Sequence, residues 1–303
     1  MPGSENSTGY KITMMKLFDG KKAARKILKE IEGEIMKKKS RRPALAVILV
    51  GDDPASKLYL KLKKETGAKI GISVQEYLFA AGAKEEEIIS KIRSLNEDKK
   101  THGIIVQLPL PGMLNADRVI AAIDLKKDVD GFQKEMKRFS LMRDKKERNF
   151  SPVLPEAILT AIGTALKKDL KNKKMVALVN SDVFGQALKE VLEKEGAQVN
   201  CLVRKACVIM GVQNEVKDAD VLISVCGCPR FIKGDMIKEG VILIDAGITR
   251  YSDGKVAGDI DIESVRNKAA FLTPVPGGIG PLNVALLLKN VYLASKNFAA
   301  ENH

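Results

Sequence analysis

The sequence predicts an α/β protein of two domains: an N-terminal α/β substrate domain and a Rossmann-like dinucleotide-binding domain, with a cleft between them. Short apolar runs alternate with segments of helical periodicity in two successive series, which indicates parallel sheets with right-handed crossovers. The 303 residues are enough for two hydrophobic cores. A charge-rich stretch with little periodicity, residues 134–149, separates the two series and is typical of a linker or surface segment.

The first series follows a polar N-terminal stretch, 1–13, which we expect to be a disordered leader. Residues 21–39 have the apolar spacing of an amphipathic helix. An unbroken apolar run over 44–50 predicts a fully buried strand. Asp53 before Pro54 predicts the start of the next helix, because Asp accepts hydrogen bonds from free N–H groups and Pro fits the first turn.

Strand and helix patterns continue to alternate after that helix. In chain order we expect a strand over 73–79, a helix over 85–95, a strand over 103–108 and a short helix that ends over 119–123. Pro109 and Pro111 close the strand over 103–108, since proline cannot donate to a ladder.

The second series has the rhythm of a dinucleotide-binding fold. Its expected elements are a helix over 155–166, a strand over 174–179, a helix over 185–195, strands over 198–203, 219–225 and 241–246, and a last helix over 281–295. The last helix places Val284, Leu287, Leu288 and Val291 on one stripe, so we expect it to pack against a core.

Charge and hydropathy limit the partners. The net charge is +13, which raises nucleic acid as an alternative partner. However, the lysines are spread over every predicted helix and aromatic residues make up only 5% of the chain, so we expect no nucleic-acid partner. We expect no membrane contact and a cytoplasmic location, because the chain lacks a signal pattern and any apolar run of about 18 residues.

Four cysteines lie close together in the sequence, at Cys201, Cys207, Cys226 and Cys228. We expect buried or inert thiols in a reducing compartment. A metal site is the alternative, but one residue separates the last two cysteines and the chain has only two histidines. We therefore predict no metal.

Tyr59 and Lys63 lie one turn apart on the helix that starts at Pro54. That helix leaves the carboxyl end of a buried strand, where open α/β sheets bind their ligands. The pair is therefore a candidate site. The alternative is a solvated lysine on a lysine-rich helix, with the tyrosine as a half-buried anchor.

Three further segments carry a resemblance together with this pair. They are Gln107-Leu108-Pro109-Leu110-Pro111, Asp128-Val129-Asp130-Gly131 and Thr273-Pro274-Val275-Pro276-Gly277-Gly278-Ile279-Gly280-Pro281. With them the chain resembles the bifunctional methylenetetrahydrofolate dehydrogenase/methenyltetrahydrofolate cyclohydrolase family from Lys16 to Lys296. The resemblance implies a folate-binding catalytic domain of residues 14–150 plus 281–300 and an NADP-binding domain of 151–280.

The resemblance implies roles at a folate site. Lys63 matches a catalytic proton shuttle, Gln107 matches the side chain that holds its amine, and Tyr59 matches an aromatic that stacks on the substrate. A lysine can shuttle protons when burial or a cationic substrate lowers its pKa. Asp130 matches the carboxylate that pairs with the pterin, although alone it could be a turn residue. The other implied substrate-binding residues are Leu108, Pro276, Gly277 and Gly278.

The cofactor site departs from the family pattern. The implied NADP-binding residues are Ser181, Gly185, Arg204, Lys205, Gly227, Ile248 and Gly280. Val179 and Asn180 stand where the family has a glycine and an arginine, and we expect Val179 to hinder close approach of the backbone to the cofactor. Arg204 and Lys205 could replace the usual partners of the 2′-phosphate, which would make NADP preferred over NAD.

The resulting prediction is an enzyme of folate one-carbon metabolism. It would oxidise 5,10-methylene-tetrahydrofolate with NADP and hydrolyse the methenyl product to 10-formyl-tetrahydrofolate. One alternative is a cyclohydrolase with weak or lost dehydrogenase activity. The other is a non-catalytic folate- or nucleic-acid-binding module. The family resemblance also implies a homodimer.

Overall fold

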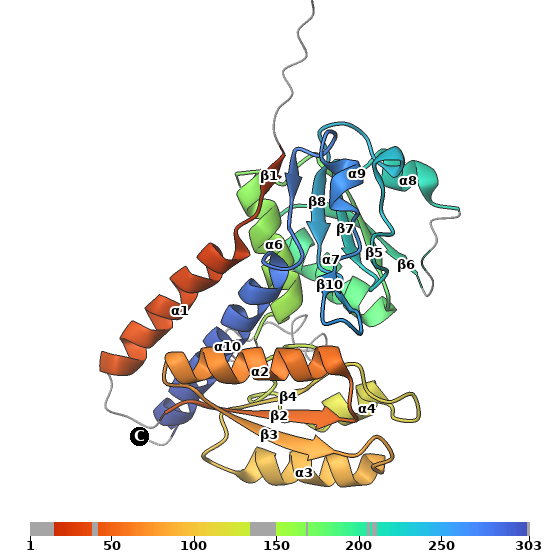
Figure 1. The fold of residues 1–303 in the computed structure, drawn as a ribbon. Helices are drawn as coiled ribbons and strands as arrows, with labels where there is room; N and C mark the ends of the chain where they lie inside the picture. The colour runs from red at the N-terminus through yellow and green to blue at the C-terminus, as the bar shows by residue number, and fades with distance from the viewer. Residues whose placement is uncertain are drawn as a thin grey trace, which may run out of the picture.

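The computed structural model describes residues 15–37, 42–133, 150–167, 169–204, 207 and 211–301. Among these residues the strands form a three-stranded sheet, a six-stranded sheet and a two-stranded ribbon. All pairs within the two larger sheets are parallel, and helices cover them (Figure 1). The predicted α/β class is confirmed. The expected leader, 1–13, and the expected linker, 134–149, lie outside the described residues.

The three-stranded sheet is built from the first series of the sequence. Strand β2 (Ala44–Val50) is buried along its whole length and lies between β3 (Ser73–Phe79) and β4 (Gly103–Val106). Figure 1 shows α2 (Pro54–Lys69) and α3 (Glu85–Glu97) on opposite faces of this sheet. Because β2 leads directly into α2, the start of α2 lies at the carboxyl end of the sheet.

The six-stranded sheet has the order β1-β11-β8-β7-β5-β6. Its members are β1 (Lys16–Leu17), β5 (Lys174–Val179), β6 (Gln198–Val203), β7 (Val221–Val225), β8 (Ile242–Asp245) and β11 (Phe271–Leu272). Helices α6 (Val153–Ala165) and α7 (Asp182–Lys194) share a core cluster with β5. This is the Rossmann-like part of the predicted architecture.

Two long helices join the halves of the molecule. The final helix α10 (Ile279–Glu301) packs along α1 (Gly20–Lys37) and also contacts α6 and α2 (Figure 1). Its residues Val284, Leu287, Leu288 and Val291 lie in the same core cluster as β2. The stripe predicted for this helix is therefore used to pack against the first sheet.

Several short elements were not expected from the sequence. They are β1, β11, α8 (Gln213–Lys217), η1 (Gly234–Met236), β9 (Thr249–Arg250), β10 (Val256–Ala257) and α9 (Ile262–Val265). Each has two to five residues, which is too short for a periodic pattern to emerge. The short helix expected to end over 119–123 is α4 (Ala116–Ala121), and Asn115 caps its start by accepting from Arg118 N.

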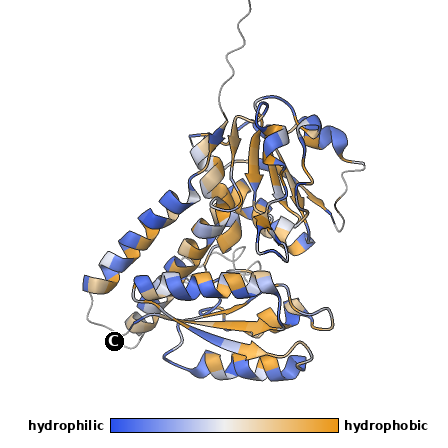
Figure 2. Ribbon diagram, in the orientation of Figure 1, coloured by the Kyte–Doolittle hydropathy of each residue, from blue (hydrophilic) through white to orange (hydrophobic). Residues whose placement is uncertain are grey.

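Hydropathy follows the layers of the fold. In Figure 2 the strands of both sheets are mostly hydrophobic, whereas α1 and α3 present hydrophilic faces outward. Lysines lie on α1, α2, α3, α7 and α10. The expectation of lysines on every predicted helix is wrong for α6, which has none. Within the described ranges, no helix is long and apolar enough to cross a membrane.

Cys207 and Cys228 form a disulfide, with Cα atoms 5.5 Å apart. The expectation of unpaired thiols is wrong for this pair, whereas Cys201 and Cys226 are free. Strands β6 and β7 flank β5 in parallel, so their carboxyl ends meet at one edge of the sheet. Cys207, four residues beyond β6, and Cys228, in the turn after β7, thereby come together, although their sequence separation is 21 residues.

Candidate functional site

The start of α2 is fixed by the residues that predicted it. Asp53 Oδ2 accepts a hydrogen bond from Ser56 N at 2.7 Å, and Pro54 occupies the first helical position. This capping satisfies one of the free N–H groups of the helix. The helix therefore carries Tyr59 and Lys63 away from the carboxyl end of β2 in a defined orientation.

Lys63 is buried, with only 6% of its surface exposed. Its Nζ donates to Gln107 Oε1 at 2.5 Å. Gln107 follows β4 directly, its backbone N donates to Ile48 O at 2.8 Å, and its Nε2 donates to Leu108 O at 3.0 Å. The amide is thus oriented with its oxygen toward the lysine, and the alternative of a solvated lysine is wrong.

Burial changes the protonation of this lysine. Loss of solvent lowers the pKa of Lys63 to about 8, and the nearby Asp130 carboxylate partly opposes this shift. Burial also raises the pKa of Asp130, which the Lys63 charge in turn opposes. The two side chains are therefore close enough to interact. An amine with a pKa near 8 exchanges protons readily at neutral pH.

The turn that carries Asp130 is held from several sides. Asp128 accepts from Gly131 N at 3.0 Å and from Gln133 N at 3.1 Å. Lys127, which is 2% exposed, donates to Leu95 O and Asp98 O, both at 2.9 Å. These contacts fix the backbone of the turn against α3.

The last helix holds the same turn from its other side. Asn290 Nδ2 donates to Val129 O at 2.9 Å. The position of Asp130 is therefore set by α3 and α10 together, and Asp130 is more than a residue of a free turn.

The proline–glycine segment meets Tyr59. A Cβ placed on Gly280 would lie 3.4 Å from Tyr59 Oη, so the first turn of α10 faces the tyrosine. A Cβ on Gly278 would lie 2.6 Å from Pro274 O, and Gly277 has a φ of +107°. The segment is thus tightly folded and depends on its glycines. Pro276 is exposed beside them.

These contacts bring five of the predicted residues together: Tyr59, Lys63, Gln107, Asp130 and Gly280. Lys63 Nζ lies 6.0 Å from the centroid of the Tyr59 ring, and burial raises the pKa of the tyrosine. Leu108 is exposed next to Gln107, 45% of its surface being accessible. The arrangement places a proton-exchanging amine, a carboxylate and an aromatic ring around one space.

The cofactor side begins at the carboxyl end of β5. Ser181 is the N-cap of α7 and accepts from Phe184 N at 3.2 Å, so the helix starts at Asp182 and the expected start at Gly185 is wrong. The N–H groups of Asp182 and Val183 have no partner within the helix and can bind an anion.

Gly185 and Val179 have packing roles in this structure. Gly185 N donates to Ser181 O at 3.1 Å, and a Cβ on Gly185 would lie 3.2 Å from Val179 Cγ2. Glycine therefore allows α7 to approach β5 closely. Val179 is fully buried in the core, so the expectation that it hinders the cofactor is wrong.

Three other predicted cofactor residues lie at the same edge of the sheet. Arg204 follows β6 directly and donates its backbone N to Val179 O at 2.7 Å. Its Nε is buried and has no hydrogen-bond partner. Gly227, with a φ of +72°, follows β7, and Ile248 follows β8. Lys205 lies outside the described residues.

Arg204 fits the group that the family resemblance implies. A buried guanidinium nitrogen without a partner is costly unless a ligand pairs with it, and phosphate is the anion that arginine binds best. The guanidinium also lowers the pKa of the Cys226 thiol, although burial raises that pKa more strongly. The arginine therefore lies near the turn after β7.

Sequence reasoning missed two features of the site. Arg250, on the β9–β10 ribbon, donates Nη1 to Pro54 O at 3.2 Å and so links the second half of the chain to the start of α2. Asp259 lies beneath the turn after β7 and accepts several of its N–H groups. Neither role was visible in the sequence, because both depend on contacts between distant segments.

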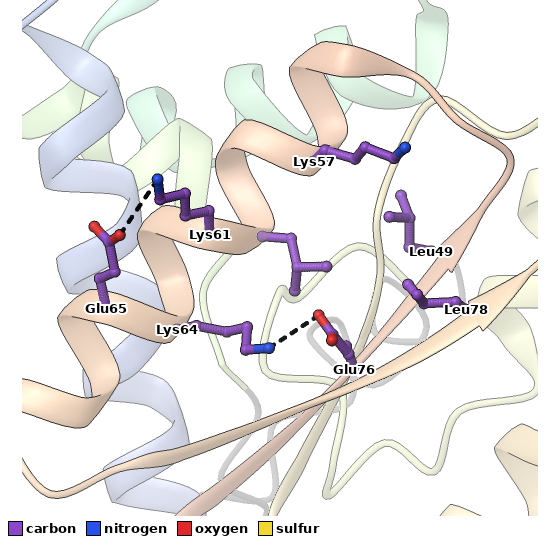
Figure 3. Close-up of a pocket in the computed structure, with 8 residues that line it drawn as sticks. Leu49, Lys57, Lys61, Lys64, Glu65, Glu76 and Leu78 are labelled. Carbon is purple, nitrogen blue, oxygen red and sulfur yellow. Dashed lines mark ion pairs between the residues drawn. The ribbon is translucent and has the colours of Figure 1, made fainter.

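A groove between α2 and strands β2 and β3 is lined by none of these residues (Figure 3). It has a volume of about 400 Å³ and is lined by Leu49, Lys57, Leu60, Lys61, Lys64, Glu65, Glu76 and Leu78. Lys64 pairs with Glu76 at 3.1 Å and Lys61 with Glu65 at 3.8 Å (Figure 3). Two of the three lining lysines are thus paired with the two lining glutamates, and Lys57 pairs with Asp52 beside the groove. The lining itself therefore carries only one excess positive charge. Within the described ranges, no group of three or more His, Cys, Asp and Glu residues could hold a metal ion.

Comparisons with known proteins cover both halves of the chain. Residues 18–130 match the family model of the tetrahydrofolate dehydrogenase/cyclohydrolase catalytic domain. Residues 152–299 match the model of the NAD(P)-binding domain of the same enzymes. The chain is 39% identical over 291 residues to the Bifunctional protein FolD of Nautilia profundicola, covering 95% of this chain and 99% of the relative.

Solved structures of the same family resemble the fold of this chain. The crystal structure of the bifunctional enzyme FolD, methylenetetrahydrofolate dehydrogenase/cyclohydrolase, from Campylobacter jejuni has a TM-score of 0.82 at 36% identity and covers 93% of this chain and 99% of its own. The Trypanosoma brucei enzyme, complexed with NADP cofactor and inhibitor, has a TM-score of 0.83 at 28% identity and covers 94% of this chain and 98% of its own.

Proposed function

Because the chain belongs to the tetrahydrofolate dehydrogenase/cyclohydrolase family, we propose which of its residues carry each of the family's two reactions. The protein is a bifunctional enzyme of folate one-carbon metabolism. It oxidises 5,10-methylenetetrahydrofolate to the methenyl compound with NADP, and it hydrolyses that product to 10-formyl-tetrahydrofolate. The two reactions need different chemistry, and the chain offers a separate set of residues for each.

Lys63 carries the hydrolysis in this proposal. Hydrolysis of the methenyl bridge adds water to a cationic carbon and then moves protons between the oxygen and the ring nitrogens. The neutral Lys63 amine takes one proton from the attacking water as the C–O bond forms, and the ammonium gives this proton to the ring nitrogen as its bond to the carbon breaks. The remaining hydroxyl proton passes to solvent as the formyl C=O forms. The observation that carries this assignment is the buried Lys63 Nζ at 2.5 Å from Gln107 Oε1, with its pKa lowered to about 8.

Gln107 keeps the amine in place. Its Oε1 accepts from Lys63 in either protonation state, because both states of the amine have N–H groups. Its Nε2 is engaged with Leu108 O, so the amide does not turn its donor toward the lysine. The glutamine therefore orients the shuttle without removing its ability to exchange protons.

The substrate binds between the start of α2 and the proline–glycine segment in this proposal. Tyr59 supplies the aromatic face, and its position against Gly280 supports that role. The Asp130 carboxylate pairs with the N–H groups on the pterin edge, since a carboxylate accepts two hydrogen bonds side by side. Leu108, Pro276, Gly277 and Gly278 are the remaining proposed contacts.

The dinucleotide lies along the carboxyl edge of the six-stranded sheet in this proposal. When bound, the nicotinamide cofactor supplies the acceptor for the hydride that leaves the methylene carbon. Arg204 and Lys205 hold the 2′-phosphate, and the start of α7 beside Ser181 offers N–H groups to the pyrophosphate. Gly227, Ile248 and Gly280 are the proposed backbone contacts, and Gly185 acts through the packing of α7.

The proposed domain division is 14–150 plus 281–300 for folate binding and catalysis, and 151–280 for NADP. The packing of α10 against α1 and α2 supports it, although β1 pairs with β11 in the second sheet. We also propose a homodimer, by analogy with the family, and a cytoplasmic location. The Cys207–Cys228 disulfide does not support a cytoplasmic location, because disulfides are rare in reducing compartments.

Substitution of Lys63 tests the proposed function. Lys63→Met should lower the rate of methenyl hydrolysis by on the order of 10²–10⁴-fold, the usual contribution of a general acid–base group. Lys61→Met is the matched control, because Lys61 is exposed on another face of α2. Hydrolysis within about threefold of wild type in a folded Lys63→Met variant would remove the lysine from the mechanism.

A further inference from the structure

Two buried carboxylates lie beneath the proposed dinucleotide site. Asp245 ends β8 and is 2% exposed, and Asp259 follows the β9–β10 ribbon and is fully buried. Charged side chains are rarely buried unless their oxygens are satisfied. The question is therefore what these two carboxylates hold.

Asp259 is surrounded by donors from the turn that follows β7. Its Oδ2 accepts from Ser224 Oγ at 2.7 Å, from Cys226 N at 2.8 Å and from Gly227 N at 3.3 Å. Its Oδ1 accepts from Cys228 N at 2.7 Å. Three consecutive backbone N–H groups thus converge on one carboxylate, which fixes the shape of the turn.

Asp245 holds Asp259 in turn. Asp245 Oδ1 accepts from the backbone N of Asp259 at 3.0 Å and from Gly247 N at 3.1 Å, and Oδ2 accepts from Ile260 N at 2.9 Å. The Asp245 carboxylate therefore binds both the turn after β8 and the backbone around Asp259. Thr273 Oγ1 accepts from Asp245 N at 2.7 Å and completes the connection to the residue after β11.

Glycines make this interlock possible. A Cβ on Gly247 would lie 2.1 Å from the Asp259 carboxylate, and a Cβ on Gly258 would lie 2.1 Å from Asp245 Oδ2. No side chain fits at either position without moving a carboxylate. The two aspartates and the two glycines therefore form a single packed unit under the turns that carry Gly227 and Ile248.

We propose that Asp259 is a positioning residue for dehydrogenation, and that it sets the backbone of the Cys226–Cys228 turn to receive the dinucleotide. The inference rests on the proposed cofactor site. Asp259 does not touch the cofactor; it acts through the turn. Only a carboxylate offers enough acceptor sites for four donors, whereas an asparagine amide would turn an N–H₂ group toward N–H groups.

The bifunctional chain supplies its own control for this proposal. In the proposed mechanism hydrolysis depends on Lys63 of α2 and on Gln107 directly after β4, and neither residue belongs to the turn after β7. A purely structural role for Asp259 would lower both activities together. A positioning role at the dinucleotide site affects NADP binding and oxidation and spares hydrolysis.

The experiment compares Asp259→Asn with Asp261→Asn in the full-length protein. Asp261 is a matched control, because it lies two residues away and its side chain makes no capping hydrogen bond to α9. Loss of charged hydrogen bonds to the turn should raise the Kd and KM for NADP by about tenfold or more in Asp259→Asn. Methenyl hydrolysis should stay within about twofold of wild type in both variants.

Ser224→Ala provides a milder test should Asp259→Asn fail to fold. It removes one of the four donors and leaves the carboxylate, so a smaller rise in KM for NADP is expected with unchanged hydrolysis. Unchanged NADP affinity in folded variants, or a parallel loss of both activities, would overturn the proposal. Wild-type protein that binds no NADP would instead overturn the proposed cofactor site itself, and that measurement comes first.

Discussion

At the scale of single residues, burial of Lys63 lowers its pKa and so makes it suited to proton transfer at neutral pH. An exposed lysine holds its proton up to a pH of about 10.4 and is a poor base at neutral pH. Lys63 is buried beside a glutamine oxygen, and its pKa falls to about 8. In the proposed mechanism, the same residue type thus serves as a proton shuttle at this position, whereas the exposed lysines of α2 remain solvated surface charges.

The rate of hydrolysis should follow the titration of this amine. The neutral form is the base, so enzymatic kcat/KM should rise with pH and level off above an apparent pKa near 8. Asp130 raises the pKa of Lys63, so Asp130→Asn should move the midpoint to lower pH. Rates corrected for uncatalysed hydrolysis at each pH test this, and a profile that falls from pH 6 to 9 would contradict the assignment of the base.

Asp130 should also anchor the substrate. Asp130→Ala removes a charged hydrogen-bonding group, so binding of a folate analogue should weaken by about 1.5–3 kcal/mol. Asp130→Asn keeps one hydrogen-bond acceptor, so its affinity for the analogue should fall less than that of Asp130→Ala. Calorimetry measures both affinities, and unchanged binding in Asp130→Ala would leave the residue with a role in the turn alone.

At the scale of elements, the strand ends and helix starts place the chemistry. The carboxyl end of β2 and the capped start of α2 set the Lys63 site, and the ends of β5, β6, β7 and β8 set the cofactor site. Because parallel strands bring their carboxyl ends to one edge, residues far apart in the sequence converge there. Arg204 reaches that edge directly after β6 with an unpaired Nε.

The end of β6 should select the cofactor. The variant Arg204→Ala/Lys205→Ala removes two cations, so NADP binding should weaken by about tenfold or more while NAD binding changes little. Titration of both cofactors against the variant and the wild type measures this. Equal NADP affinity in both proteins would show that another group holds the 2′-phosphate.

Local signals explain which elements the sequence could predict. Asp53 and Pro54 gave the start of α2 correctly, since capping depends on neighbouring residues. The predicted start of α7 at Gly185 is three residues too late, because the helix begins at Asp182. Ser181 is the N-cap residue of α7, a role that serine commonly has. Strands β1 and β11 form only because distant segments pair, which no local pattern reveals.

The contacts within the candidate site also could not be predicted from local sequence patterns. Tyr59, Lys63, Gln107 and Asp130 were identified through a family resemblance, and the burial that lowers the pKa of Lys63 emerged only from the packed structure. The partners of Asp259 and the Cys207–Cys228 disulfide also depend on tertiary contacts. Sequence spacing alone could not place these atoms together.

At the scale of the whole molecule, two sheets share one chain and α10 joins them. The helix begins at the proline–glycine segment beside Tyr59 and ends against the core of the first sheet. Arg250 provides a second link, from the β9–β10 ribbon to the start of α2. The proposed folate-binding residues and the proposed cofactor edge are therefore linked through α10 and Arg250.

Parallel assays of both reactions on one preparation of the wild-type protein test this account most directly. We predict NADP-dependent oxidation of 5,10-methylenetetrahydrofolate and hydrolysis of the methenyl compound, with 10-formyl-tetrahydrofolate as the end product. Hydrolysis without any oxidation at millimolar NADP would contradict it and leave a cyclohydrolase on a scaffold that no longer uses its dinucleotide edge.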